Sequence, residues 1–276
     1  MKVLTDVHTH STFSHDGLSS LDEMFKQAHS LGVAFYGVSE HMDYDYCNDK
    51  GEFTQIHTDC DAYYHTARHL QEDYQGVMNV LVGAEFGYSG REVIQKLYVE
   101  HIEKYNPDFV VNSVHSMGNG MDEDYYFKKV FVKNGKVRDK EEVYTEYLKQ
   151  IKKSLDAPYR YDIVAHVGYP ARYGPYEDPK MHYDEYADLY DDILKTIIAK
   201  DKILEANSGG KDLTLAYKEV LQRFYQLGGR KVSFASDAHG TDRILRNREQ
   251  VVEMLKEIGF TYITVPFKGE HIKVEI

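Results

Sequence analysis

The first strand-like segment of the chain is VLTDVHTH, residues 3–10, in which an apolar run leads into two histidines. Alternate side chains of an extended strand share a face, so His8 and His10 point the same way from a rigid support. Two imidazoles aimed at one point are the beginning of a metal site. A lone H-x-H pair is weak evidence, because a single buried histidine is more often structural.

Further apolar runs recur along the chain and alternate with helical patterns. The runs are short, rich in β-branched residues and without clean polar alternation, which is typical of strands covered on both faces. We expect strands at residues 3–7, 33–38, 77–84, 109–114, 161–165, 202–206, 231–235 and 262–265. We expect helices at residues 21–31, 56–75, 92–103, 141–155, 184–200, 213–227 and 242–258, the first behind a capping box at Ser20 to Glu23. The repeated order of strand and helix predicts an α/β barrel with parallel strands.

Polar side chains suited to a metal site follow each of the first seven expected strands. They are His8 and His10, His41, Glu85, His115, His166, Asn207, and finally Asp237 with His239. In a closed parallel barrel the carboxyl ends of the strands share one face, where such folds place their active sites. Imidazole together with carboxylate suits Zn, Mn or Fe better than Mg or Ca. Each residue alone could be a helix cap or a satisfied core histidine, but those roles do not explain the shared position.

Length and composition narrow the class of protein. A chain of 276 residues fits one barrel domain over residues 1–276. The formal net charge of -12 and the lack of a long Lys/Arg run argue against a protein that grips nucleic acid or an anionic membrane. No leader-like or membrane-spanning apolar stretch is evident, so we expect a cytoplasmic protein with a small substrate. We expect Cys47 and Cys60 to be free thiols, and the sequence indicates no oligomeric state.

Two segments depart from the alternation of strand and helix. Residues 130–137 carry Asn134-Gly135 at their centre, a dipeptide that accepts the positive φ angles of a tight turn, and we expect a small hairpin on the rim there. Residues 169–183, YPARYGPYEDPKMHY, hold three prolines and four tyrosines. Proline excludes regular helix or strand, so we expect a loop over the site.

The ordered motifs resemble those of the PHP (polymerase and histidinol phosphatase) superfamily. The resemblance rests on HTH at 8–10, FSHDG at 13–17, SEH at 39–41, GAE at 83–85, SVH at 113–115, AH at 165–166 and SDAH at 236–239, and it extends over residues 3–240. It implies a distorted (β/α)7 TIM-like barrel, a cluster of up to three divalent metal ions and hydrolysis of phosphoesters.

The resemblance also implies which side chains hold the metals. The first metal would be held by His8, His10, Glu85 and Asp237, the second by Glu85, His115 and His166, and the third by Asp16, His41 and His239. Family members carry either His or Asp near position 15 or 16. Asp16 matches the ligand position better by its spacing from His10, which leaves His15 as a general-acid candidate or a solvated loop residue.

Within the superfamily the chain is most similar to bacterial monofunctional histidinol-phosphate phosphatases. The similarity rests on AHVGY at 165–169, ARYGPY at 171–176 and LEANS at 204–208, and it implies that Arg172, Lys211 and Asn207 bind substrate. Some relatives carry Arg directly after Asn-Thr, whereas Gly209-Gly210-Lys211 follows Ser208 here. The cation that completes the phosphate pocket is therefore open between Arg172 and Lys211.

The implied reaction is hydrolysis of L-histidinol phosphate in histidine biosynthesis. Two or three cations can lower the pKa of a bridging water, whose hydroxide would attack phosphorus, while Arg172 stabilises the developing charge. The proton for the leaving alcohol would come from His15, Asp237 or His239. The segment Asp43 to Tyr46 and the tyrosine-rich loop could recognise the ammonium and imidazole of histidinol.

Three other functions remain open at this stage. A nucleotide or sugar phosphate could replace histidinol phosphate with the same chemistry. A metal-dependent amide hydrolase would normally bridge its metals with a modified lysine, whereas the third strand here ends in Glu85. A non-catalytic metal-binding PHP module would normally belong to a longer, basic polymerase chain, and this chain is acidic.

Overall fold

A seven-stranded parallel sheet forms the centre of the molecule. The computed structural model describes residues 3–46, 57–117, 130–209 and 217–276. The strands are β1 (Leu4–Asp6), β2 (Val33–Met42), β3 (Asn79–Gly87), β4 (Val110–Ser113), β7 (Ile163–Val164), β8 (Ile203–Asn207) and β9 (Val232–Ala235), and they lie side by side in that order. Every neighbouring pair is parallel. The α/β class predicted from the sequence is confirmed.

The sheet curls into a nearly closed barrel whose first and last strands meet at their carboxyl ends. Thr9 forms a parallel bridge with Ala238, and the backbone N–H groups of Asp237 and His10 donate to the carbonyls of His8 and Ala238 at 3.0 and 2.8 Å. This closure places the segment after β1, with His8 and His10, beside the segment after β9, with Asp237 and His239. The predicted distorted (β/α)7 barrel is therefore confirmed.

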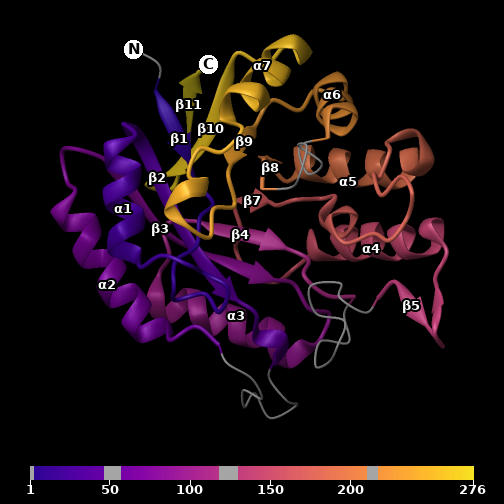
Figure 1. Cartoon of the computed structure of the whole chain (residues 1–276), viewed down its shortest axis with the longest axis horizontal. Coiled ribbons are helices and arrows are strands. Elements are labelled where there is room, and N and C mark those ends of the chain that lie inside the picture. Colours follow the sequence, from indigo (N-terminus) through magenta and orange to yellow (C-terminus); the bar gives the residue numbers. More distant parts are fainter. Residues whose placement is uncertain (1–2, 47–56, 118–129, 210–216) are drawn as a thin grey trace.

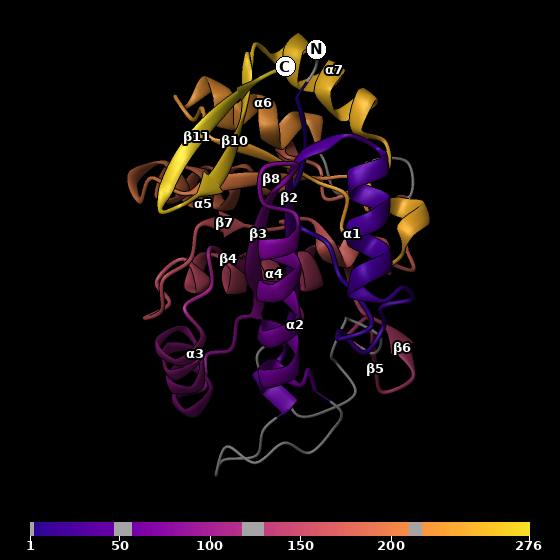
Figure 2. The same ribbon diagram turned by 90° about the vertical axis from the view of Figure 1, so that its left-hand side faces the viewer.

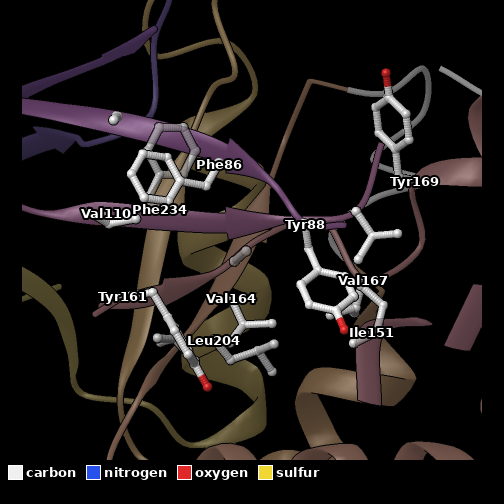
Figure 3. Close-up of a cluster of buried hydrophobic side chains, with 14 of the residues drawn as sticks. Phe86, Tyr88, Val110, Ile151, Tyr161, Val164, Val167, Tyr169, Leu204 and Phe234 are labelled. Atoms are coloured by element: carbon white, nitrogen blue, oxygen red, sulfur yellow. The ribbon is translucent and has the colours of Figure 1, made fainter. Parts of the chain in front are cut away.

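Helices cover the outside of the barrel (Figure 1). They are α1 (Leu21–Ser30), α2 (Cys60–Asp73), α3 (Glu92–Tyr105), α4 (Lys140–Ser154), α5 (Ala187–Ala199), α6 (Lys218–Gln226) and α7 (Arg248–Ile258). The predicted capping box of α1 is present, because Ser20 accepts from the Glu23 backbone N–H while the Glu23 carboxylate accepts from that of Ser20. Between helices and strands lies a core that includes Phe86 and Val110 on neighbouring strands and Ile151 of α4 (Figure 3). No helix of the described residues is long and apolar enough to cross a bilayer.

The ring of Phe109 packs in the apolar interior of the barrel. Phe109, directly before β4, is buried among Val7, Leu81 and Ile163. A Cβ atom added at Gly83 would lie 2.4 Å from the Phe109 ring, and one at Gly37 would lie 3.0 Å from it. The glycines of β2 and β3 therefore make room for the ring.

The last expected strand does not belong to the barrel. Residues 262–265 fall in β10 (Tyr262–Phe267), which pairs antiparallel with β11 (Glu270–Glu275). Val265 and Val274 pack against the apolar interior of the barrel, and Figure 2 shows the hairpin as a separate ribbon beside the parallel sheet. The strand expected at residues 262–265 is present, but it pairs antiparallel outside the seven-stranded sheet. A local apolar run does not reveal its pairing partner.

Several other boundaries differ from the expected ones. The helix expected at 242–258 is instead a 3-10 turn at Thr241–Arg243 followed by α7, because Leu245 and Asn247 adopt left-handed φ angles between them. The helix expected from residue 56 begins at Cys60, where Asp59 caps it.

The segment 130–137, where a hairpin was expected, contains the antiparallel pair β5 (Val132–Lys133) and β6 (Lys136–Val137), with positive φ at Asn134 and Gly135.

Candidate metal centre

The Glu85 carboxylate lies at the centre of five histidines. It lies near the carboxyl end of β3, opposite His41 in the register of β2, and its side chain is fully buried. The distances from its oxygens are 2.7 Å to His41 Nδ1, 2.9 Å to His166 Nε2, 3.2 Å to His115 Nε2, 3.3 Å to His8 Nε2 and 3.6 Å to His10 Nε2. These side chains come from five strand ends, so the barrel brings together what the sequence separates.

Asp237 extends this group on the side of His8 and His10. Its Oδ1 lies 3.4 Å from His10 Nε2 and 4.0 Å from His8 Nε2. Its other oxygen, Oδ2, accepts a hydrogen bond from Arg172 at 3.0 Å. The four ligands expected for the first metal therefore converge.

A third group forms at the mouth of the barrel. His41 Nε2 and His239 Nε2 are 3.3 Å apart, and Asp16 lies 3.6 Å from the former and 3.3 Å from the latter. His15 Nδ1 is 4.0 Å from Asp16, and the His15 side chain is 37% exposed at the mouth. The geometry favours Asp16 over His15 as a member of this group.

The donor set fits divalent cations. His8 Nε2, His10 Nε2 and Glu85 Oε2 are buried atoms without a hydrogen-bond partner in the described part of the chain. Buried polar atoms are normally satisfied, and a group left so costs stability. These three atoms lie among further imidazoles and carboxylates, and three-residue groups with the spacing of metal ligands include His8/His10/Glu85, His10/His41/His239 and Glu85/His115/His166. The residues could hold two or three ions of the Zn, Mn or Fe type.

Charge is concentrated in this cluster. Burial alone would raise the pKa of the Glu85 carboxyl, but the neighbouring His8 and His115 hold it well below its ordinary value. Burial alone would lower the pKa of His115, but Glu85 and Asp43 raise it to about 10. For His10 burial prevails, and His41 adds to it, so its pKa falls well below the ordinary value. The carboxylates of the cluster thus attract positive charge, which a bound cation would also supply.

Two candidate ligands adopt unusual backbone conformations. The φ angles of His166 and Asp237 are 21° and 54°, in the left-handed region that residues other than glycine rarely adopt. The backbone N–H of His166 donates to Glu205 at 2.9 Å, and that of Asp237 donates to the His8 carbonyl at 3.0 Å. Such conformations persist where surrounding contacts hold them, and they are common at functional sites.

Several residues support the site through contacts that the sequence did not indicate. Glu205 Oε1 lies 2.6 Å from His8 Nδ1, and Asp43 Oδ1 lies 3.0 Å from His115 Nδ1. Ser113 Oγ donates to Glu85 Oε1 at 2.6 Å. Carboxylates on the far nitrogen of a ligating histidine fix its orientation and its tautomer. Strand alternation could have found Glu205, because it stands two residues before Asn207 on the same face of β8.

The three residues expected to bind substrate differ in where the structure places them. Arg172 lines a cavity of about 220 Å³ together with Tyr169, Tyr173, His15 and the outer ligand candidates, and it stacks on Tyr169 with its guanidinium carbon 5.0 Å from the ring centre. Asn207 is fully buried: its amide donates to Glu205 and its oxygen accepts from the Gly209 backbone, so both ends of its amide group have partners within the protein. Lys211 lies outside the described residues.

The expectation for the segment after β2 also needs correction. Asp43 and Asp45 are buried rather than turned to the cavity. Asp43 contacts His115, and Asp45 accepts from Ser116 at 3.0 Å with Arg91 at 3.8 Å. Their charges have partners within the protein, so they are not available for the ammonium group of a substrate.

The chain matches the model of a known protein family. A model of the PHP domain matches residues 6–209, which contain all the candidate ligands except Asp237 and His239. The chain belongs to the PHP domain family. The PHP match begins within β1 and ends just after β8, so the family region contains most of the barrel.

Curated PHP relatives extend over most of this chain. A probable histidinol-phosphatase of Clostridium acetobutylicum is 30% identical over 254 residues, which are 90% of this chain and 91% of the relative. The histidinol-phosphatase of Lactococcus lactis is 26% identical and covers 92% of this chain and 91% of its own length.

Solved structures support the same fold. A Lactococcus lactis histidinol phosphate phosphatase, complexed with zinc, L-histidinol and phosphate, superposes with a TM-score of 0.84 at 23% identity, over 99% of this chain and 100% of the other. A putative histidinol phosphatase from Listeria monocytogenes gives a TM-score of 0.73 at 20% identity, over 89% of this chain and 99% of the other. At these identities the match establishes the PHP barrel of the chain.

Proposed function

We propose that this chain hydrolyses L-histidinol phosphate to L-histidinol and phosphate. The observation that carries the proposal is the buried Glu85 carboxylate with five histidine side chains around it, in a barrel whose curated relatives are named histidinol-phosphatases. The structural relative from Lactococcus lactis binds zinc, L-histidinol and phosphate. The fit of its fold to this chain makes the same chemistry the first one to test.

Two or three divalent ions would occupy the site. His8, His10, Glu85 and Asp237 would hold one, Glu85, His115 and His166 a second, and Asp16, His41 and His239 a third. Zinc is supported by the relative from Lactococcus lactis, and the mixed nitrogen and oxygen donors also suit manganese and iron. When bound, such ions polarise the phosphoryl group and lower the pKa of a water that serves as nucleophile.

Arg172 would bind the phosphoryl oxygens. Its Nη2 donates to Asp237 Oδ2, and its ring partner Tyr169 holds the guanidinium at the cavity. Its Nε is buried and has no hydrogen-bond partner in the described part of the chain. A planar guanidinium offers several N–H groups in a fixed fork, so it can keep Asp237 and still contact phosphate.

His15 would donate the proton to the leaving alcohol. Among the three candidates, Asp237 and His239 face the ligand groups, whereas His15 stands at the edge of the cavity. A proton donor must lie within hydrogen-bond reach of the leaving oxygen.

A panel of phosphomonoesters tests the substrate. We expect the zinc- or manganese-loaded protein to release phosphate from L-histidinol phosphate at a kcat/KM at least about tenfold above that for nucleotide or sugar phosphates, a difference of about 1.4 kcal/mol in transition-state binding. Equal turnover of all of them would remove the specific substrate and leave a general phosphoesterase. The absence of nucleic-acid partners and a place in the cytoplasm stay predictions, and no oligomeric state is proposed.

A further inference from the structure

The imidazole of His10 differs from those of His8 and His115 in how its outer nitrogen is held. His8 and His115 have a carboxylate at Nδ1, from Glu205 and Asp43. His10 Nδ1 instead lies 3.4 Å from the hydroxyl of Ser14. A hydroxyl can either donate or accept, so by itself it does not fix which ring nitrogen of His10 carries the hydrogen.

The Glu40 carboxylate removes this ambiguity. It is fully buried, and the obligatory backbone donors of Ser11 and Ser14 reach its two oxygens at 2.9 and 3.0 Å. The Ser11 and Ser14 hydroxyls also lie on it, at 2.6 and 2.5 Å. Both carboxylate oxygens therefore act as acceptors, and the hydroxyl hydrogen of Ser14 is directed to Glu40.

The remaining contacts of Ser14 then follow. Its Oγ accepts from the backbone N–H of His41 at 3.0 Å, which is again an obligatory donor. With its hydrogen given to Glu40, the Ser14 oxygen can only accept from His10 Nδ1. The hydrogen of a neutral His10 ring then belongs on Nδ1, and the lone pair of Nε2 faces the centre.

The other side of the ring agrees with this assignment. His10 Nε2 is buried and has no hydrogen-bond partner among the described residues. The carboxylate atoms Asp237 Oδ1 and Glu85 Oε2 stand 3.4 and 3.6 Å from it. We propose that Ser14 and Glu40 are positioning residues that fix the His10 tautomer with Nε2 free to ligate metal. This inference rests on the metal-binding role of His10 in the proposed function.

The chain offers a matched pair of variants. Ser11 and Ser14 both donate a hydroxyl hydrogen to Glu40 from buried positions of one loop, but of the two hydroxyls it is that of Ser14 that lies beside His10 Nδ1. Ser11→Ala and Ser14→Ala should each lower the urea midpoint of the metal-stripped protein. Only Ser14→Ala should weaken zinc binding, by about tenfold or more, as expected for loss of an outer partner of a ligand.

The measurement is the zinc dissociation constant from competition with a chromogenic chelator, together with zinc per chain after dialysis. Histidine-selective ¹⁵N NMR of the metal-stripped chain adds a second readout. The wild type and Ser11→Ala should show His10 with its hydrogen on Nδ1, and Ser14→Ala should lose this signal. Glu40→Gln keeps the hydroxyl of Ser14 but turns an acceptor into an amide, and it should weaken zinc binding in the same way, which covers the case that Ser14→Ala does not fold.

Equal zinc affinity in Ser11→Ala and Ser14→Ala, or an unchanged affinity in Glu40→Gln, would overturn the inference and leave the proposed function intact. A wild-type protein that binds no zinc, manganese or iron would instead refute the proposed function, and the inference with it.

Discussion

At the scale of single residues, the site depends on one carboxylate that many side chains share. Glu85 is within 3.6 Å of five imidazoles, and each of three of those rings has a partner on its far side that orients it. Most candidate ligands could be predicted from the sequence because they lie at or just after the ends of strands. Asp16, in the loop after β1, was placed by its spacing from His10 in the family motif. The role of Asp43 could not be predicted, because it depends on the tertiary distance to the His115 ring. Strand alternation places Glu205 on the same face as Asn207, but it does not show that Glu205 contacts His8.

Glu205→Gln tests the outer layer of the site. The amide keeps the shape of the side chain but lacks the charge that faces His8 Nδ1 at 2.6 Å. We expect zinc affinity to fall about 10- to 100-fold, since outer partners of ligands have effects of that size. Competition with a chelator measures it, and Glu257→Gln is the control, because Glu257 pairs with Lys218 on the surface. An unaltered affinity would mean that His8 needs no outer partner.

His15→Ala tests the proton donor. A leaving alkoxide needs a proton, whereas the phenolate of p-nitrophenyl phosphate leaves without one. We expect kcat for L-histidinol phosphate to fall about 100-fold or more, with little change for p-nitrophenyl phosphate. Equal losses for both esters would show that His15 acts in binding or folding instead.

At the scale of secondary-structure elements, the strand ends position the site and the barrel interior sets the strand spacing. The seven parallel strands could be predicted because their apolar runs are local signals. The hairpin of β10 and β11 could not, since the run at residues 262–265 predicts a strand without showing that Glu270–Glu275 pairs with it. The break before α7 was also hidden, because left-handed φ angles at Leu245 and Asn247 are not typical of either residue in a helical pattern.

Gly83→Ala tests the packing inside the barrel. The added methyl would lie 2.4 Å from the Phe109 ring, so β3 and β4 must separate or the ring must move. We expect a loss of about 1–3 kcal/mol in the free energy of unfolding, as for other overpacked cores. Gly90→Ala is the control because nothing lies within 4 Å of its added Cβ. Restored stability in Gly83→Ala combined with Phe109→Leu would locate the cause, and a neutral Gly83→Ala would contradict the account.

The packing of α3 on the barrel predicts a pH dependence. Burial lowers the pKa of His101 to about 3, from an ordinary 6.5, and its ring nitrogens contact the hydroxyls of Tyr44 and Tyr64. A depressed pKa stabilises the fold above pH 6.5, and this stability is lost as the pH falls towards 3. From pH 7 to 5 the metal-stripped wild type should lose about 2 kcal/mol more than His101→Gln in urea unfolding. Equal losses would mean that His101 titrates normally.

At the scale of the whole molecule, the barrel converts a linear series of motifs into one compact charge cluster. The ends β1 and β9 meet through Thr9 and Ala238, and this contact brings Asp237 to His10 across most of the chain. Folding therefore brings the candidate ligands together. Cations that bind this site should in turn stabilise the folded state, because a ligand that prefers the folded state raises the free energy of unfolding.

Metal binding should therefore raise global stability. At free zinc about 100 times the dissociation constant, each site adds about 2.7 kcal/mol to the free energy of unfolding. Urea unfolding with zinc and with EDTA measures the difference. Coincident curves would show that zinc does not bind the folded chain in preference to the unfolded one.

Phosphate release from L-histidinol phosphate, measured before and after metal is removed and returned, tests the central claim most directly. We predict turnover by the zinc- or manganese-loaded chain, loss of turnover after chelation and dialysis, recovery on reloading, and no recovery for His166→Ala. Undiminished turnover by the stripped chain, or full activity of His166→Ala, would contradict a metal-dependent phosphatase site around Glu85.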